Sequence, residues 1–421
     1  MWTRPQSRRQ RRARARLQRR SRRSPALRAL WSSAMALAGP AASAWADSPI
    51  EGVEADYHYS TYTEDDLATS KGLAGGVTSR YEIQMHQFSL RAPVGERWDV
   101  GLDVIHETMS GASPQYVVPD AAGDPVQVMS GASIDDERND LLVTWNRYFD
   151  SGRLGLSSGY SSEKDYRAIN LGVDGETSFN EGNTTLSAGL GMSFDTIEPT
   201  DANLFATRPD DETKQSYQLL LGLSQVLNRA TLLQTSVTYK HSRGYLSDPY
   251  KSMFVVGGTF LPDERPDVRN QLSWLTRFRG HVRELQGTLH ANYQFHIDDW
   301  GISSHTFELA WYQKIGRLTL VPSTRYYTQT AAKFYVPYFT VLPVIIDYSN
   351  DFRLSAYGSL TLGFKAEYVL PFKWTGGHDL ILTLAFDRYF SSEDLSWEED
   401  PQEAPGLVSY SIVTLGFAVH W

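Results

Sequence analysis

The sequence predicts an all-β protein, a transmembrane antiparallel β-barrel of about 16 strands, with 14 or 18 strands as the alternatives. Three observations lead to this fold class. Short segments in which apolar and polar residues alternate recur along the chain. The connections between them are alternately short and long, and the chain ends on one such segment, VTLGFAVHW.

Residues 1–46 differ sharply from the rest of the chain. They contain twelve Arg and no Asp, Glu or Lys, and they include an apolar run over 26–42 and the small-residue site Ala44-Trp45-Ala46. This order predicts a secretory signal peptide cleaved before Asp47. A nucleic-acid-binding arm and a membrane anchor are the alternatives, and the abrupt change to acidic sequence argues against both. We therefore expect a signal peptide, 1–46, and a single barrel domain, 47–421.

The charge balance and composition exclude several classes of protein. The chain has 40 Lys and Arg against 49 Asp and Glu; without the twelve leader Arg, 28 basic residues remain and the net charge is −21. Such a chain is not a general binder of nucleic acid. The mean hydropathy of −0.38 is too polar for a bundle of membrane helices. The absence of Cys excludes disulfides and thiolate chemistry.

Alternation of apolar and polar residues marks each strand, because successive side chains of a strand point to opposite faces. Helical spacing is not sustained over a comparable length anywhere in the chain. The segments with the alternating pattern are Val53–Tyr59, Trp98–Val104, Leu141–Trp145, Leu186–Phe194, Tyr217–Leu223, Leu289–Ile297, Phe307–Trp311, Leu354–Tyr368 and Leu380–Phe386.

The connections between strands form two alternating classes. Seven are short, at 93–96, 149–153, 174–184, 227–230, 280–284, 313–317 and 376–379. Eight belong to the other side, at 61–79, 107–138, 160–166, 195–214, 242–267, 298–305, 328–351 and 391–407. These fifteen connections join sixteen strands. Short turns face the periplasm and long loops face outward in membrane barrels, so both termini are expected on the periplasmic side.

Tryptophan positions favour the barrel over a soluble β-sandwich array or propeller. In a soluble fold the apolar faces would point into a core, and aromatic residues would not need to collect at strand ends. Interfacial girdles of a membrane barrel do require them there. The residues in or beside the apolar faces are Trp98, Trp145, Trp274, Trp311 and Trp421.

The C-terminal segment has the features of a membrane-assembly signal. A terminal aromatic residue follows alternating apolar residues, and we expect the barrel assembly machinery to bind this pattern. We also expect the segment to pair with Val53–Tyr59, which leaves no free sheet edge in lipid. The residues of the signal are Val413, Leu415, Phe417, Val419 and Trp421.

Several short motifs resemble those of a Gram-negative outer-membrane family catalogued as domain of unknown function 3570. The resemblance covers nearly all of the chain after the leader. It implies an outer-membrane barrel, whereas it implies no activity. A tendency of members to be encoded near thioredoxin-like, lipoprotein and flavin-transferase proteins points to redox or metal work in the envelope. The motifs are YHYSTYTEDDL (57–67), MSGASP (109–114), MSGASIDDER (129–138), NTTLSAGL (183–190), GYLSDPYK (244–251) and RPDVRNQ (265–271).

One strand, LHANYQFHID, places a row of polar residues on its inward face. Imidazoles near a carboxylate can bind transition metals. However, the two His of this row are three alternate steps apart, at about 6.6 Å per step. They would need partners such as His58, Glu82 or His86, so a polar wall lining water is the favoured interpretation. The candidate lumen-lining residues are His290, Asn292, Gln294, His296 and Asp298.

Three long connections carry further signals. MSGAS occurs twice around Pro119, Gly123 and Pro125, which predicts a β-excursion that leaves the membrane and returns; a ligand site formed by both copies is the alternative. In a second connection, Arg265 or Arg269 is expected to pair with Asp248 or Asp267 and to pin the loop. The apolar loop FYVPYFTVLPVII (334–346) is expected to fold into the barrel, to cap a neighbouring loop or to contact a partner.

These patterns predict a porin-like channel for small solutes or ions, cationic or metal-bearing ones included, in the Gram-negative outer membrane. The alternative is a closed barrel that scaffolds an envelope complex linked to redox or metal handling, with periplasmic partner proteins. An outer-membrane enzyme has less support, because the chain has no G-x-S-x-G, P-loop or H-E-x-x-H motif. No cofactor is expected. Acidic outer loops are compatible with a divalent cation shared with lipopolysaccharide phosphates, and the oligomeric state is left open.

We expect that deletion of Trp421 impairs insertion into the outer membrane more than it changes solute preference. The physical reason is that the terminal strand must be recognised before it can close the barrel. The measurement is the fraction of protein that reaches the heat-modifiable, folded form in cells. Normal assembly of the truncated chain would contradict this interpretation of the C-terminus.

Overall fold

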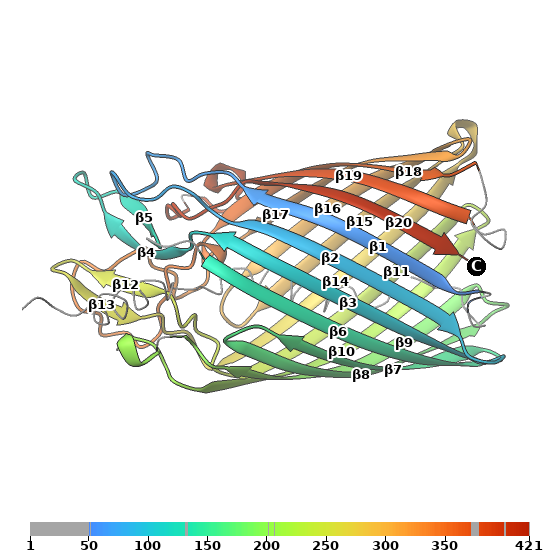
Figure 1. Ribbon diagram of the computed structural model, residues 1–421, viewed down its shortest axis with the longest axis horizontal. Helices are drawn as coiled ribbons and strands as arrows, with labels where there is room; N and C mark the ends of the chain where they lie inside the picture. The colour runs from blue at the N-terminus through green and yellow to red at the C-terminus, as the bar shows by residue number, and fades with distance from the viewer. Residues whose placement is uncertain are drawn as a thin grey trace, which may run out of the picture.

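A computed structural model describes residue 50 and residues 52–420, except 131–133, 201, 206, 372–378 and 400, and it describes only the backbone at 134 and 135. Residues 1–46 lie outside the described residues, so the signal peptide stays a prediction. The described chain forms a closed antiparallel barrel of 16 strands with long loops at one end (Figure 1). The predicted fold class and strand number are therefore confirmed.

Every strand of the barrel pairs with its neighbours in chain order, apart from two hairpins that stand outside it. The barrel strands are β1 (Glu54–Glu64), β2 (Glu82–Pro93), β3 (Trp98–Gly111), β6 (Ile134–Phe149), β7 (Gly152–Ser162), β8 (Tyr166–Phe179), β9 (Thr184–Ile197), β10 (Glu212–Asn228), β11 (Thr231–Gly244), β14 (Val268–Val282), β15 (Gly287–Asp298), β16 (Ser303–Ile315), β17 (Leu318–Gln329), β18 (Tyr357–Val369), β19 (Asp379–Ser392) and β20 (Tyr410–His420).

Two extra hairpins and four 3-10 turns lie in the connections, as far as the structure describes them. The hairpins pair β4 (Pro114–Pro119) with β5 (Pro125–Met129) and β12 (Ser252–Val255) with β13 (Thr259–Pro262). The turns are η1 (Ala202–Leu204), η2 (Arg283–Leu285), η3 (Phe352–Leu354) and η4 (Glu393–Leu395). In the part of the chain that the structure describes, no helix is both long enough and apolar enough to span a membrane.

Pairing of the first and last strands closes the barrel. Ala55 lies opposite Val419, and Tyr57 lies opposite Phe417, with ring centroids 5.5 Å apart. Glu54 lies opposite His420, so the chain enters and leaves the barrel at the end with the short turns. The expected pairing of the last strand with the first is therefore confirmed, and so is the position of both strand ends beside the short turns. Trp421 lies outside the described residues.

Side chains alternate between the two faces of the wall, and the outward face is apolar. Leu156, Leu190 and Leu221 point outward and remain 54%, 52% and 55% exposed. A continuous band of such residues would be costly in water but is suited to lipid. Inward positions on the same strands are small, polar or charged, such as Ser157 and Gln218. The barrel therefore spans a membrane, with a polar interior.

Predicted strand boundaries differ from the observed ones by several residues at some connections, such as 107–138 and 174–184, and one difference changes the environment of a residue. Leu354 was expected to begin the strand that ends at Tyr368, but that strand begins at Tyr357 and Leu354 lies in η3. Asp351 caps this turn by accepting a hydrogen bond from the backbone N–H of Arg353. Leu354 is 4% exposed and packs among the outer loops. An alternating pattern at a strand end cannot distinguish a wall residue from a loop residue that is buried elsewhere.

The β-excursion predicted for the connection 107–138 is the hairpin β4–β5. At its base the two MSGAS copies meet, because the Ser130 N–H donates to the Ser113 carbonyl (2.7 Å) and the Ser113 N–H donates to the Ser130 hydroxyl (3.0 Å). Met129 and Ala112 pack with Leu67 beside them. The described part of the repeat thus holds the neck of an excursion.

Neighbouring residues on β10 give a test of the two faces. We expect Leu221→Arg, which points into lipid near the middle of the strand, to lower the free energy of unfolding by about 2–4 kcal/mol. The matched change Leu220→Arg points inward and should cost much less, because its charge can reach water. The measurement is equilibrium unfolding by denaturant of protein refolded in lipid vesicles. Equal losses for both variants would contradict the assignment of faces.

Candidate functional site: lumen wall and loop cover

The five predicted lumen residues all belong to β15, where they contact the inward faces of the two adjacent strands. The ring centroids of His290 and Tyr312, which lies on β16, are 4.2 Å apart. Asn292 Oδ1 accepts a hydrogen bond from Arg279 Nη1 (2.7 Å) on β14. Gln294 stands between Leu275 and Thr306 in the strand register.

The remaining two predicted residues lie nearer the loops. His296 Nδ1 is 2.8 Å from the Ser273 hydroxyl, and His296 Nε2 is 3.9 Å from Asp298 Oδ2. Asp298 is 8% exposed and accepts a hydrogen bond from Arg269 Nε (2.8 Å). His290 and His296 thus have different partners and do not share a site. The structure does not bring either one to His58, Glu82 or His86, which lie on β1 and β2.

Inward-facing charges are separated around the lumen. On strands β10 to β18 the basic residues outnumber the acidic ones, and on the other strands the reverse holds. The inward charges of β10 to β18 are Lys214, Lys240, Arg269, Arg277, Arg279, Lys314, Arg325 and Lys365, with Glu212, Asp298, Glu308 and Glu367. Those of the other strands are Glu54, Asp56, Glu64, Asp99, Asp103, Glu107, Asp136, Asp140, Asp174, Glu176, Asp195, Asp379 and Asp387, with Arg91, Arg138 and Arg153.

The long loops pack against one another at the outer mouth. We call this assembly the loop cover and define it as residues 245–267, 299–302, 330–356 and 393–409. Its apolar centre draws residues from several connections, and seven of them are buried. These seven are Trp300, Ile302, Ala332, Phe334, Tyr335, Leu354 and Ala404. Because these seven side chains are buried against one another although their segments do not pair with barrel strands, the cover is an ordered layer rather than a set of independent loops.

Arg80 joins the first long connection to the cover. Its guanidinium donates to the carbonyls of Leu407 (2.8 Å) and Gly406 (2.6 Å) and lies 3.4 Å from Glu64. Both side chains of this ion pair are almost completely buried, at 2% and 5% exposure. A buried guanidinium with several acceptors fixes the orientation of the loop that carries it.

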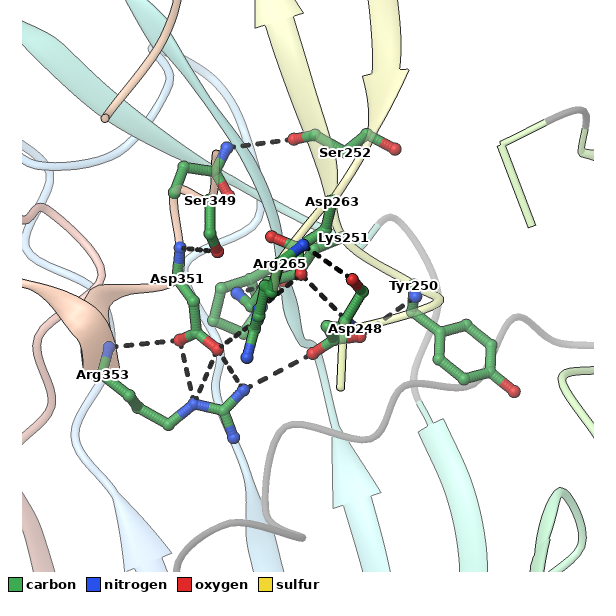
Figure 2. Close-up of polar contacts among 12 residues, drawn as sticks. Asp248, Tyr250, Lys251, Ser252, Asp263, Arg265, Ser349, Asp351 and Arg353 are labelled. Carbon is green, nitrogen blue, oxygen red and sulfur yellow. Dashed lines mark hydrogen bonds and ion pairs between the residues drawn. The ribbon is translucent and has the colours of Figure 1, made fainter. Parts of the chain in front are cut away.

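Asp351 is the centre of a buried ion network that holds two loops of the cover together (Figure 2). It is fully buried and accepts hydrogen bonds from Arg353 Nε (2.9 and 3.0 Å) and Arg265 Nη2 (2.9 Å). Arg353 follows Asp351 in the same loop, whereas Arg265 comes from the connection between β11 and β14. The network therefore links residues that are far apart in sequence.

Two further carboxylates and a lysine complete the network. Asp263 accepts from Arg265 Nε (2.7 Å) and from the backbone N–H of Asp248 (2.8 Å). Lys251 is 4% exposed, and its ammonium is 3.5 Å from the Pro114 carbonyl at the start of β4. The excursion β4–β5 thereby contacts the same cluster, which contains both signs of charge and so limits the cost of burial.

The pKa shifts of the network show how the surroundings favour or disfavour ionisation of each carboxyl group. Burial acts to raise the pKa of Asp351, but Arg353, Lys251 and Arg265 outweigh it and hold that pKa well below its ordinary value. Burial raises the pKa of Asp263 and is the dominant effect there. Because the pKa of Asp351 is lower in the folded chain, ionised Asp351 stabilises the cover at neutral pH, and this contribution is lost only as the pH falls through the depressed pKa.

Arg265 was correctly expected to form an ion pair in this loop, but the predicted partners are wrong. Arg265 pairs with Asp263 and Asp351, not with Asp248 or Asp267. Arg269 pairs with Asp298 on the barrel wall. The central residue Asp351 was missed, because nothing in its local sequence distinguishes it from an ordinary turn residue.

The apolar loop 334–346 divides into two parts. Phe334 and Tyr335 are buried in the loop cover, as the expectation of a capping loop required. Val344 and Ile346, in contrast, are 100% and 81% exposed, so the second part does not fold into the barrel. The expectation of a loop cap is therefore confirmed for the first residues, whereas contact with a partner stays a prediction for the exposed second part.

The geometry defines a transmembrane β-barrel of the outer-membrane type, with a polar lumen and an ordered loop cover. The chain belongs to the family described as "Protein of unknown function (DUF3570)", whose sequence pattern matches residues 27–389. The resemblance expected from the short motifs is thereby confirmed. No curated protein matches the chain.

Solved structures of other proteins are similar to this chain. A bacterial polysaccharide outer membrane secretin is 9% identical, with a TM-score of 0.42 over 87% of this chain and 97% of that one. OccK2 (OpdF) of Pseudomonas aeruginosa, solved with glucuronate, is 11% identical, with a TM-score of 0.39 over 88% and 98%. CdiB of Acinetobacter baumannii is 8% identical, with a TM-score of 0.45; the match covers 88% of this chain and 60% of CdiB. These similarities concern the fold alone.

We expect Asp351→Asn to loosen the loop cover by about 3–5 kcal/mol, because it leaves Arg265 and Arg353 buried without their shared anion. The barrel itself should remain folded. The measurement is amide hydrogen exchange of residues 245–267 and 330–356 in detergent. Asp267→Asn, at an exposed position of the same cover, is the matched control and should leave exchange unchanged. Protection of the cover equal to wild type in Asp351→Asn would contradict its central role.

Proposed function

We propose that the protein is an outer-membrane channel for small polar solutes and ions, exported to the Gram-negative envelope through a cleaved signal peptide. One observation carries this proposal: the inward face of the barrel bears ionisable side chains along its length. Arg325, for example, points inward from the central part of β17 and is exposed. Burying so many charges without water would be prohibitively costly, which supports a hydrated lumen.

The distribution of charge supports a preference of the channel for cations over anions. Inward-facing Asp and Glu outnumber Lys and Arg over the barrel strands, so the lumen as a whole attracts cations. The separation of a basic wall from an acidic wall would also orient a solute that carries both charges. The loop cover lies at the outer mouth and would limit the size of the solutes that enter.

A second candidate function follows from the loop cover itself. Its buried ion network and apolar centre give it the order of a small domain, and the exposed residues Val344 and Ile346 form an apolar tip on it. Exposed apolar surface of this kind is typical of protein contacts. We therefore keep, as the alternative, a closed barrel that presents this cover to an envelope complex.

Planar-bilayer recording tests the channel. We expect the refolded protein to conduct and to favour K⁺ over Cl⁻ in a KCl gradient, because the lumen carries excess negative charge. Arg325→Glu should increase that preference, on the order of twofold. Arg167→Glu makes the same charge change on the outward face and should leave the selectivity unchanged. Absence of conductance from folded protein would overturn the channel and favour the closed scaffold.

A further inference from the structure

Three carboxylates converge at the outer end of the acidic wall. Asp136 lies on β6, and Glu163 and Asp165 lie in the link between β7 and β8. One oxygen from each side chain lies within 4.8 Å of the other two. Two ligand atoms that bind one Ca²⁺ at about 2.4 Å are at most about 4.8 Å apart, so the separations of the three oxygens fall within the range that a shared ion requires.

Carboxylates outnumber basic side chains around this cluster. Arg138 is the cation on the same face of β6, and its guanidinium lies 2.6 Å from Asp140, 3.8 Å from Glu107 and 3.9 Å from Glu163. Arg138 is shared by three carboxylates, and Lys164 is a second basic residue in the same link, so carboxylates remain in excess around the cluster. Asp136 and Asp165 are 6% and 3% exposed, so bulk water screens their repulsion poorly.

An independent observation comes from Ser161. Its side chain is on the inward face of β7, opposite Asp140 and two residues before Glu163. The residue is 6% exposed, and its buried hydroxyl has no hydrogen-bond partner among the described residues. A buried hydroxyl without a partner is costly. A water molecule on a cation held by Glu163 would supply the missing partner.

We propose that Asp136, Glu163 and Asp165 bind one hard divalent cation, with Ca²⁺ as the best fit. Their donor atoms are all carboxylate oxygens, which Ca²⁺ prefers, and its flexible coordination leaves room for water molecules beside Ser161. The bound ion offsets the repulsion among the three side chains. This site is separate from the lumen residues of β15, and its occupancy does not depend on whether the barrel conducts.

The position of the site gives the ion a structural consequence. The Tyr250 hydroxyl donates a hydrogen bond to Asp165, and the Tyr250 backbone N–H donates to Asp248 of the buried ion network (3.0 Å; Figure 2). Tyr250 thus connects the cation site on the barrel wall to the loop cover. Removal of the ion should therefore loosen the connection between β11 and β14 as well as the link between β7 and β8.

Calorimetric titration tests the site. Protein refolded in detergent, and therefore free of lipopolysaccharide, is stripped with a chelator and titrated with CaCl₂. We expect one saturable site in the wild type and at least tenfold weaker binding in the double variant Asp136→Asn/Glu163→Gln. Ser161→Ala, which removes only the contact to a cation-bound water, should weaken binding by a few fold.

The control variant removes one carboxylate charge at a position away from the site. Glu198→Gln alters an exposed carboxylate paired with Arg167 and should bind Ca²⁺ as the wild type does. Folding of each variant is verified by heat-modifiable migration in gels, and Asp165→Asn is the substitute if the double variant does not fold. Lack of saturable binding by wild-type protein, or wild-type affinity in the folded variants, would overturn the proposal.

Discussion

The structure depends on one constraint, that every backbone N–H and carbonyl within lipid must find a partner inside the protein. Sixteen strands meet this demand only when the first and last of them pair, as β1 and β20 do from Glu54 and His420 to Glu64 and Tyr410. Closure makes the wall continuous. Because β1 and β20 pair antiparallel, the start of β1 and the end of β20 both lie on the short-turn side. The long connections are thereby gathered at the other mouth, where they can pack against one another.

Closure also assigns a separate environment to each face of every strand. Outward residues in the middle of the strands are apolar because they contact lipid, and Leu190 and Leu221 follow this rule. Inward residues are freed from that requirement, so charge can accumulate there. The separation of basic β10 to β18 from the acidic remainder is a property of the assembled wall: Arg279 and Lys365 belong to the same side of the lumen although 86 positions separate them in the chain.

The loop cover shows why the candidate site was harder to predict than the barrel. Arg265 and Asp248 were recognised as loop residues that could form ion pairs, yet the principal partner of Arg265 across the cover is Asp351, from a different connection. Sequence neighbours offer several carboxylates of equal reach, and the packing of the loop cover determines which of them is buried beside the guanidinium. The same holds for Asp136, Glu163 and Asp165, which three-dimensional packing brings together from β6 and the β7–β8 link.

The sequence by itself determined the fold class, the number of strands, the alternation of short and long connections and the pairing of the C-terminal strand with the first. These features follow from a period of two residues and from the need to close the sheet, both of which are local or general rules. Tertiary structure alone decided that Leu354 belongs to the cover rather than the wall, which carboxylate Arg265 binds, and which half of loop 334–346 is buried. Those outcomes depend on contacts between distant loops, because burial and charge pairing there are set by neighbours in space and not by periodicity along the chain.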